Sequence, residues 1–450
     1  MQVFSRLKSA NFAHLLDFAL VLGGTAFATG TGFLLKVFIG RNLGPGQLGI
    51  FGICYAFLTI VSMLADLGVR YSLINLASRA VNENNDTRAR RLVAAGMLLK
   101  LVGGLGVAVL GWFLAPLVAE NLLNKPQLTP FLQITSIGVA IWSLWDGLEG
   151  ALHVKQKFSW GAGCRITLEF LRLLCFASLW GYAQGEYLSL DRFMWLYFAT
   201  PISALIIGMA FCKKLYSRGP KPIEARIKKE EMKELIVFSR GIFFYRSASV
   251  VLLFLDSLML TRHGGLDQVG LFEAAKGLAF ALLLVSESLQ QVLLPKVNQI
   301  KTIEQIKELV RKSGRYFAVL FASALIWMLV ASPFLGLFGE AFTKPGVATT
   351  FYLMVTVTLF TIPSTIWSTV LLTLDQPISL GCIASCQVIL GLILYPLAIP
   401  MGGPVATAAT ALTLQVVGCL AYGIALYREV KRREQNKGTE LESSSQSKNV

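Results

Sequence analysis

The stretch that decides the fold of this chain is RNLGPGQLGIF, at residues 41–51, because its pattern occurs twice. The same spacing of charged and small residues returns 221 residues later as RHGGLDQVGLF, at residues 262–272. Further along the repeat, Asp66 falls opposite Glu287. Two related halves in one apolar chain are typical of transporters built from parallel repeats, whose substrate site lies between the halves.

The composition is that of a membrane protein with many spans. The chain has 450 residues, of which 54% are hydrophobic and 15% charged, and its mean hydropathy is +0.61. A helix that crosses a bilayer needs about 20 apolar residues. Runs of this kind lie near 17–39, 48–68, 93–118, 130–152, 161–183, 193–214, 236–261, 268–294, 315–338, 348–373, 378–399 and 402–427. We therefore expect an all-α polytopic membrane protein with about 12 transmembrane helices in two pseudo-symmetric six-helix bundles.

The basic residues predict the orientation of these spans, because Lys and Arg in short loops stay on the cytoplasmic side. With both termini in the cytoplasm, most of the basic residues lie in inner segments, and the outer loops hold only Arg41, Lys125, Arg192, Arg262 and Lys344. This asymmetry and contact with anionic lipid headgroups account for the net charge of +15. The charge is therefore no argument for a nucleic-acid partner.

The chain is expected to divide at a basic, proline-containing stretch. We predict an N-terminal six-helix bundle over 1–214, a cytoplasmic linker over 215–235, a C-terminal six-helix bundle over 236–427 and a largely disordered cytoplasmic tail over 428–450. A short surface helix is expected at 303–313. The tail ends in a polar run that has little apolar surface to bury.

We expect no cofactor, no metal site and no enzymatic activity. The sequence has no GxxxxGK[ST] phosphate loop and no HExxH helix. Cys382 and Cys386 have helical spacing, but no His or carboxylate stands beside them to complete a metal site. The cysteines fall in or at the edges of spans, where they are most simply apolar filler and not a disulfide frame.

Ionisable residues inside the predicted spans are the candidates for function, because each costs about 3 kcal/mol or more unless it faces a partner or a water-filled cavity. The candidate substrate-binding cations are Arg246, Arg240, Arg165, Arg172, Lys36 and Lys276. The candidate ion-coupling or gating acids are Glu287, Asp66, Glu273, Asp256 and Glu169. The aromatic candidates for stacking on a sugar are Tyr245 and Trp145.

Several of these charges also have a structural interpretation. Asp66 and Arg70 are one helical turn apart, so a local ion pair is as good an interpretation of Asp66 as a proton site. Glu169 has the spacing to neutralise one of the two arginines on its helix face. Lys36 and Lys100 lie close enough to span ends for their stems to reach the interface. Asp256 is either a gate residue or a solvated helix end.

Arg246 is harder to neutralise, because it lies about 15 Å along its predicted helix. Its candidate partners within the chain are Glu273 and Glu287. A site with surplus Arg and Lys suits a substrate that carries phosphate, because a guanidinium binds phosphate oxygens with two hydrogen bonds. An exporter of cations would favour surplus carboxylates instead.

The first 90 residues resemble a known family. The motif at 40–51, the segment ADLGV at 65–69 and the segment NLASR at 75–79 are similar to the polysaccharide biosynthesis or oligosaccharide flippase (Wzx-like) family of the multidrug/oligosaccharidyl-lipid/polysaccharide exporter superfamily. The resemblance implies an inner-membrane protein that moves an undecaprenyl-pyrophosphate-linked oligosaccharide to the outer leaflet by alternating access, coupled to an ion gradient. The products to which it points are surface polymers such as O-antigen lipopolysaccharide or exopolysaccharide.

The resemblance also implies partners and leaves two alternatives open. Besides the lipid-linked oligosaccharide and membrane lipids, a polysaccharide polymerase and a chain-length regulator are candidate protein partners. One alternative is a multidrug or toxin cation antiporter with the same fold. The other is a membrane scaffold that recruits polysaccharide assembly enzymes through its basic loops.

Overall fold

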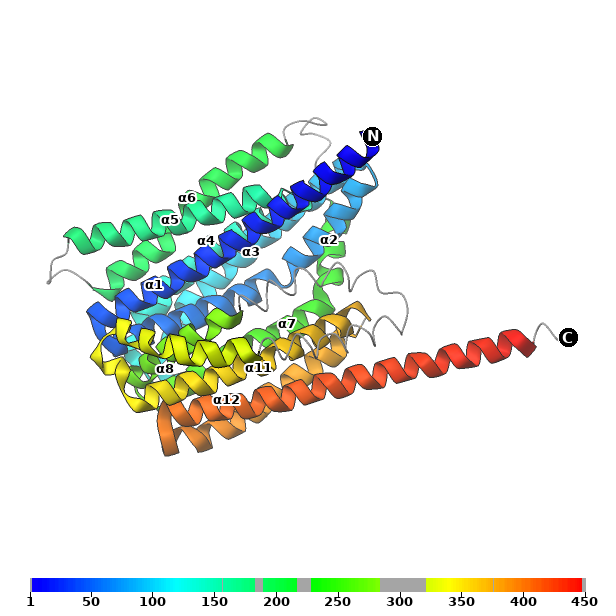
Figure 1. Ribbon diagram of the computed structural model, residues 1–450. Helices are drawn as coiled ribbons and strands as arrows, with labels where there is room; N and C mark the ends of the chain where they lie inside the picture. The colour runs from blue at the N-terminus through cyan, green and yellow to red at the C-terminus, as the bar shows by residue number, and fades with distance from the viewer. Residues whose placement is uncertain are drawn as a thin grey trace. The chain divides into compact units, whose positions relative to one another are not determined.

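The computed structural model describes residues 2–155, 157–182, 189–216, 228–283, 321–374 and 376–446. Its regular structure in these ranges is helical throughout, which confirms the predicted all-α class (Figure 1). The first part of the chain forms α1 (Gln2–Asp66), α2 (Val69–Asn82), α3 (Asp86–Leu117), the π-helix η1 (Val118–Leu122), the 3-10 helix η2 (Pro126–Leu128), α4 (Thr129–Val154), α5 (Phe158–Tyr182), α6 (Leu190–Tyr216), α7 (Lys229–His263) and α8 (Leu266–Ala279). The remainder forms η4 (Phe280–Leu282), helical residues 321–331, η5 (Ser332–Phe338), η6 (Glu340–Thr343), α11 (Pro345–Thr373) and α12 (Pro377–Gln446).

Helix α1 contains two of the predicted spans, joined by a sharp kink at Gly44. The backbone there has φ 84° and ψ 174°, a conformation that glycine adopts readily because it has no Cβ. Pro45 follows and starts the second arm, where a missing N–H costs nothing. The blue chain reverses direction at this point (Figure 1). The motif RNLGPGQLGIF is thus the turn between spans predicted at 17–39 and 48–68.

Helix α12 repeats this glycine–proline design, and the break between α7 and α8 lies at the position equivalent to the kink of α1. Helix α12 kinks at Gly403, where φ is 52° and ψ is −126°, and Pro404 again starts the second arm. Helices α7 and α8 are separated at Gly264 and Gly265. Gly265 is the residue that the repeat places opposite Gly44, so α7 and α8 correspond to the two arms of α1.

The repeat is also visible in reciprocal close packing. A methyl group on Gly49 would overlap the carbonyl oxygen of Leu266, and one on Gly270 would overlap the carbonyl oxygen of Pro45. Gly49 and Gly270 are equivalent in the repeat, and so are Pro45 and Leu266. The second arm of α1 and the start of α8 therefore approach backbone to backbone around a local pseudo-twofold axis.

The chain divides into two compact units, Met1–Ala274 and Ala275–Val450. In the first unit, α1 packs against α4, α5 and α7, and α4 packs against α3 and α6. The first turns of α7 belong to this unit because Leu235 is buried in a cluster with Leu73, Leu92 and Val154. In the second unit, α11 packs against α12, and Trp327 donates a hydrogen bond to the Leu278 carbonyl at 3.2 Å. The predicted division into two six-helix bundles stays a prediction.

Eight helical stretches among the described residues are long and apolar enough to cross a membrane. Two of these, Gly23–Asp66 and Pro377–Arg433, each contain a kinked pair of predicted spans. Helix α5 is not among the eight, because Arg165, Glu169 and Arg172 lie close together in it. The end of the span predicted at 268–294, the start of that at 315–338, the surface helix at 303–313 and linker residues 217–227 lie outside the described residues.

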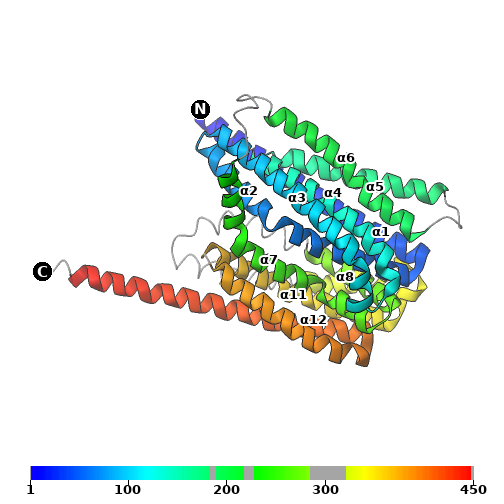
Figure 2. The same ribbon diagram turned by 180° about the vertical axis from the view of Figure 1, so that it is seen from behind.

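Helix α12 includes most of the C-terminal tail, for which disorder over 428–450 stays a prediction. Helix α12 continues to Gln446, and its red end runs on past α11 in both views (Figure 1 and Figure 2). Glu429 accepts hydrogen bonds from Arg432 at 3.0 Å and Arg433 at 2.8 Å. Arg433 also donates to the Leu374 carbonyl at 2.9 Å, at the end of α11. These local pairs and the helix-forming Lys, Arg and Glu side chains favour continuation of the helix.

Candidate functional site

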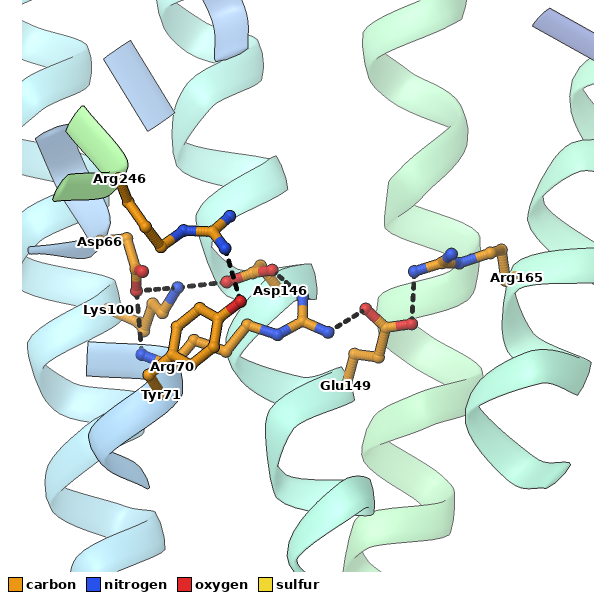
Figure 3. Close-up of polar contacts among 8 residues, drawn as sticks. All are labelled: Asp66, Arg70, Tyr71, Lys100, Asp146, Glu149, Arg165 and Arg246. Atoms are coloured by element: carbon orange, nitrogen blue, oxygen red, sulfur yellow. Dashed lines mark hydrogen bonds and ion pairs between the residues drawn. The ribbon is translucent and has the colours of Figure 1, made fainter. Parts of the chain in front are cut away.

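A continuous chain of ion pairs crosses the first compact unit (Figure 3). It begins at Asp66, which pairs with Lys100, and Lys100 also pairs with Asp146. The guanidinium of Arg70 joins Asp146 to Glu149, and its bond to Glu149 is 3.0 Å long. Arg165 closes the chain with a bond of 2.6 Å to the other oxygen of Glu149. Helices α1, α2, α3, α4 and α5 are therefore linked by one network.

This network is electrically neutral. It contains three carboxylates and three cations, and each carboxylate contacts two groups of the network. The Lys100 side chain is only 1% exposed and that of Glu149 only 6%. Buried charges of this kind are tolerated because each has an opposite charge at contact distance.

The turn between α1 and α2 sets the position of one end of the network. Gly68 has φ 76°, which favours glycine, and a Cβ there would lie 3.0 Å from the Cβ of Ser239. Just before it, the Asp66 carboxylate accepts the Arg70 backbone N–H at 3.1 Å and so satisfies a free donor in the first turn of α2. The segment ADLGV thereby holds Asp66 toward Lys100 and directs the Arg70 side chain toward α4.

Arg246 lies next to this network and is not part of it. Its guanidinium donates a hydrogen bond to the hydroxyl of Tyr71 and lies 4.8 Å from the centre of that ring (Figure 3). Among the described residues, no carboxylate forms a salt bridge with Arg246. The expected partner Glu273 is bound elsewhere, and Glu287 lies outside the described residues. Arg246 therefore adds one positive charge to a neutral neighbourhood.

A second polar cluster surrounds Glu273 on α8. One of its carboxylate oxygens accepts from Lys36 at 2.9 Å and the other from Ser257 at 2.6 Å. Ser257 also bonds to Asp256, which is buried and so is not a solvated helix end. Lys36 and Ser257 are equivalent in the repeat, so related positions hold this carboxylate from two sides.

A third cluster lies between α5 and α6. Arg172 bonds to both oxygens of Glu169, at 2.8 and 3.0 Å, and also to Thr200 at 3.3 Å. Its guanidinium lies 4.0 Å from the ring centre of Tyr197. Arg172 is 3% exposed and its charge is neutralised within its own helix. The prediction that Glu169 neutralises one arginine of α5 is thereby confirmed, while Arg165 pairs with Glu149 instead.

The remaining candidate residues are scattered. Trp145 is 2% exposed, and it packs with Leu148, Cys164, Leu168 and Ala204. Neighbouring side chains cover the ring, and its role in stacking on a sugar stays a prediction. Tyr245 is half-buried on α7 and Arg240 is exposed. Lys276, in the second compact unit, is buried 5.5 Å from the ring centre of Phe280.

The candidate set from the sequence omits the centre of the network. Arg70, Lys100, Asp146 and Glu149 all lie in it, and Tyr71 holds Arg246. The sequence does contain a signal for the two carboxylates of the network. Asp146 and Glu149 are three residues apart in an apolar helix and so share a face. The expectation that Lys100 reaches the interface is wrong, because its ammonium group is buried between two carboxylates.

Solved structures with the same fold are membrane transporters. An inward-facing multidrug resistance MATE family transporter of the MOP superfamily has a TM-score of 0.69 at 13% identity, with 91% of this chain and 96% of that chain covered. The lipid II flippase MurJ, in an inward closed conformation, has a TM-score of 0.69 at 14% identity, with 92% and 89% covered. A MOP superfamily transporter from Pyrococcus furiosus has a TM-score of 0.56 at 14% identity, with 92% and 96% covered. The chain is thus a multi-pass membrane protein with a transporter fold.

Sequence comparison supplies the family. Residues 16–301 match the polysaccharide biosynthesis protein family, and this match covers more than half of the chain. The protein belongs to that family, as the motifs at 40–51 and 65–69 predict. A comparison with the curated proteins finds no match.

Proposed function

We propose that the protein is a flippase that moves an undecaprenyl-pyrophosphate-linked oligosaccharide across the inner membrane by alternating access, for surface polysaccharide synthesis. Membership in the polysaccharide biosynthesis family supports the substrate class. The fold is compatible with lipid-linked substrates, since one of the similar structures is a lipid II flippase. In this proposal both termini are cytoplasmic, and the protein moves the lipid-linked sugar without chemical change.

The observation that carries the proposal is the surplus positive charge at Arg246. The adjoining network of six charged groups is neutral, so Arg246 is the cation of this site that a substrate anion can bind without breaking an ion pair. A guanidinium offers two parallel N–H donors to a phosphate group and stays charged at any physiological pH. A diphosphate therefore fits this position better than a cationic drug does.

Fold alone does not separate the flippase from a multidrug cation antiporter. The similar structures include a multidrug resistance transporter as well as a lipid II flippase. For the similar transporter from Pyrococcus furiosus, the reverse polarity of its binding pocket suggests a different function. Within this fold, the sign of the charge at the site is therefore a better guide to the substrate than the helix arrangement.

The proposal is tested by the pool of lipid-linked saccharide in cells that lack the protein. We expect undecaprenyl-pyrophosphate oligosaccharide to accumulate on the cytoplasmic leaflet, and re-expressed wild type to clear it. Re-expressed Arg246→Gln should fail to clear it. Lys233→Gln is the control, because it removes the same charge from an exposed position on the same helix. An unchanged pool and leaflet distribution in the deletion strain would contradict the flippase proposal and direct attention to drug efflux.

A further inference from the structure

The contact between Tyr71 and Arg246 connects the two halves of the repeat. Tyr71 is in the first turn of α2, which belongs to the first half, and Arg246 is on α7, which begins the second half. The bond runs from the Arg246 guanidinium to the Tyr71 hydroxyl, and the tyrosine ring lies beneath the same guanidinium. One side chain of α2 thus supplies both an acceptor atom and a π face to the surplus cation.

Tyr71 is held firmly, but its hydroxyl bond to Arg246 is easily exchanged. Its backbone N–H donates to the Gly68 carbonyl at 3.1 Å, and the side chain of its neighbour Arg70 is fixed by Asp146 and Glu149. A neutral phenol oxygen is a weaker acceptor for a guanidinium than an anionic phosphate oxygen. Tyr71 is 36% exposed, so solvent or substrate can reach this contact.

We infer that Tyr71 is a positioning residue that holds Arg246 in the empty protein and gives it up to the phosphate of the substrate. The inference rests on the proposed function, because it takes the substrate to be a lipid diphosphate. The phenol oxygen accepts from the same guanidinium N–H group that donates to a phosphate oxygen on binding. Since the contact joins α2 to α7, its exchange for substrate also releases a link between the two halves of the repeat.

Tyr71→Phe separates the acceptor atom from the ring. The variant keeps the aromatic face beneath Arg246 and removes only the oxygen with which the substrate competes. We expect it to bind undecaprenyl pyrophosphate about fivefold more tightly than wild type, which corresponds to about 1 kcal/mol. Damage to the fold would weaken binding, so a gain in affinity has no merely structural explanation.

The experiment measures binding of undecaprenyl pyrophosphate to the purified full-length protein by calorimetry. It compares wild type, Tyr71→Phe, Arg246→Gln and the double variant, each checked for an unchanged thermal transition. We expect Arg246→Gln to weaken binding by at least about tenfold. The gain from Tyr71→Phe should disappear in the Arg246→Gln background, because no guanidinium is left for the phenol to hold.

The outcomes distinguish this inference from the proposed function. Weaker binding by Tyr71→Phe in both backgrounds would show that the hydroxyl contacts the substrate directly, and would overturn the inference. Unchanged binding by Tyr71→Phe together with weaker binding by Arg246→Gln would overturn the inference and leave the flippase proposal standing. Unchanged binding by both variants would remove Arg246 from the substrate site, which would overturn the inference and remove the observation that carries the proposed function.

Discussion

Lys100 is the residue whose removal should test the ion-pair network most severely. Its side chain is 1% exposed, and its ammonium group lies between the carboxylates of Asp66 and Asp146. Lys100→Gln leaves three carboxylates and two arginines in the network, so one buried negative charge has no counter-charge. Removing one partner of a buried pair costs about 3–5 kcal/mol, most of it from the charge left behind. We expect Lys100→Gln to lower the free energy of unfolding by this amount.

A second substitution should reverse much of the loss. Lys100→Gln combined with Asp66→Asn leaves two carboxylates and two arginines, so neutrality returns. Asn also keeps a side-chain oxygen that can accept the Arg70 backbone N–H in the first turn of α2. The double variant should therefore be more stable than Lys100→Gln alone, whereas two independent losses of stability would add.

The assay is equilibrium unfolding of the purified protein in mixed micelles with increasing SDS, followed by tryptophan fluorescence. Arg79→Gln is the control, because the Arg79–Glu83 pair is exposed, with side chains 77% and 50% accessible. Such pairs contribute less than about 1 kcal/mol. A Lys100→Gln variant no less stable than Arg79→Gln would refute the reasoning, as would a double variant less stable than the single one.

Two further predictions concern the packing of the repeat halves. The 2.6 Å ion pair between Arg91 and Glu231 holds the start of α7 on α3. Arg91→Glu should therefore speed hydrogen exchange over residues 229–239 about tenfold. Adding Glu231→Arg should restore the slow exchange of the wild type. Exchange that stays fast in the double variant would contradict the pairing. Gly49→Ala places a methyl group against the Leu266 carbonyl and should cost about 1–3 kcal/mol of stability. Gly106 has open space around it, so Gly106→Ala should leave the stability unchanged in the same unfolding assay. Equal losses of stability in the two variants would refute the close approach of Gly49 to Leu266.

The positions of the helices along the chain follow from the sequence, because they depend on local signals. Apolar runs of span length and the glycine–proline turns at Gly44 and Gly403 each act within a few residues. The repeat then relates the α7–α8 break to the kink in α1. At the start of the tail, Glu429 pairs with Arg432 and Arg433 within the helix, and the disorder of the tail stays a prediction.

The pairing of charges could not be predicted in the same way, because it depends on which helix faces meet. Asp66 has the spacing to pair with Arg70, but its carboxylate accepts the Arg70 backbone N–H while the guanidinium reaches Asp146 and Glu149 on α4. Arg246 was expected to meet a carboxylate of the next span and instead meets Tyr71. A single sequence shows which residues share a helix face but not which faces pack together.

The central claim is that Arg246 binds the diphosphate of a lipid-linked sugar during its passage across the membrane. Its most direct test is the initial rate at which reconstituted protein moves a fluorescent undecaprenyl-pyrophosphate oligosaccharide between the leaflets of a liposome. We expect the rate with Arg246→Gln to fall at least about tenfold, while Lys233→Gln keeps the wild-type rate. Equal rates for wild type, Arg246→Gln and Lys233→Gln would contradict the claim.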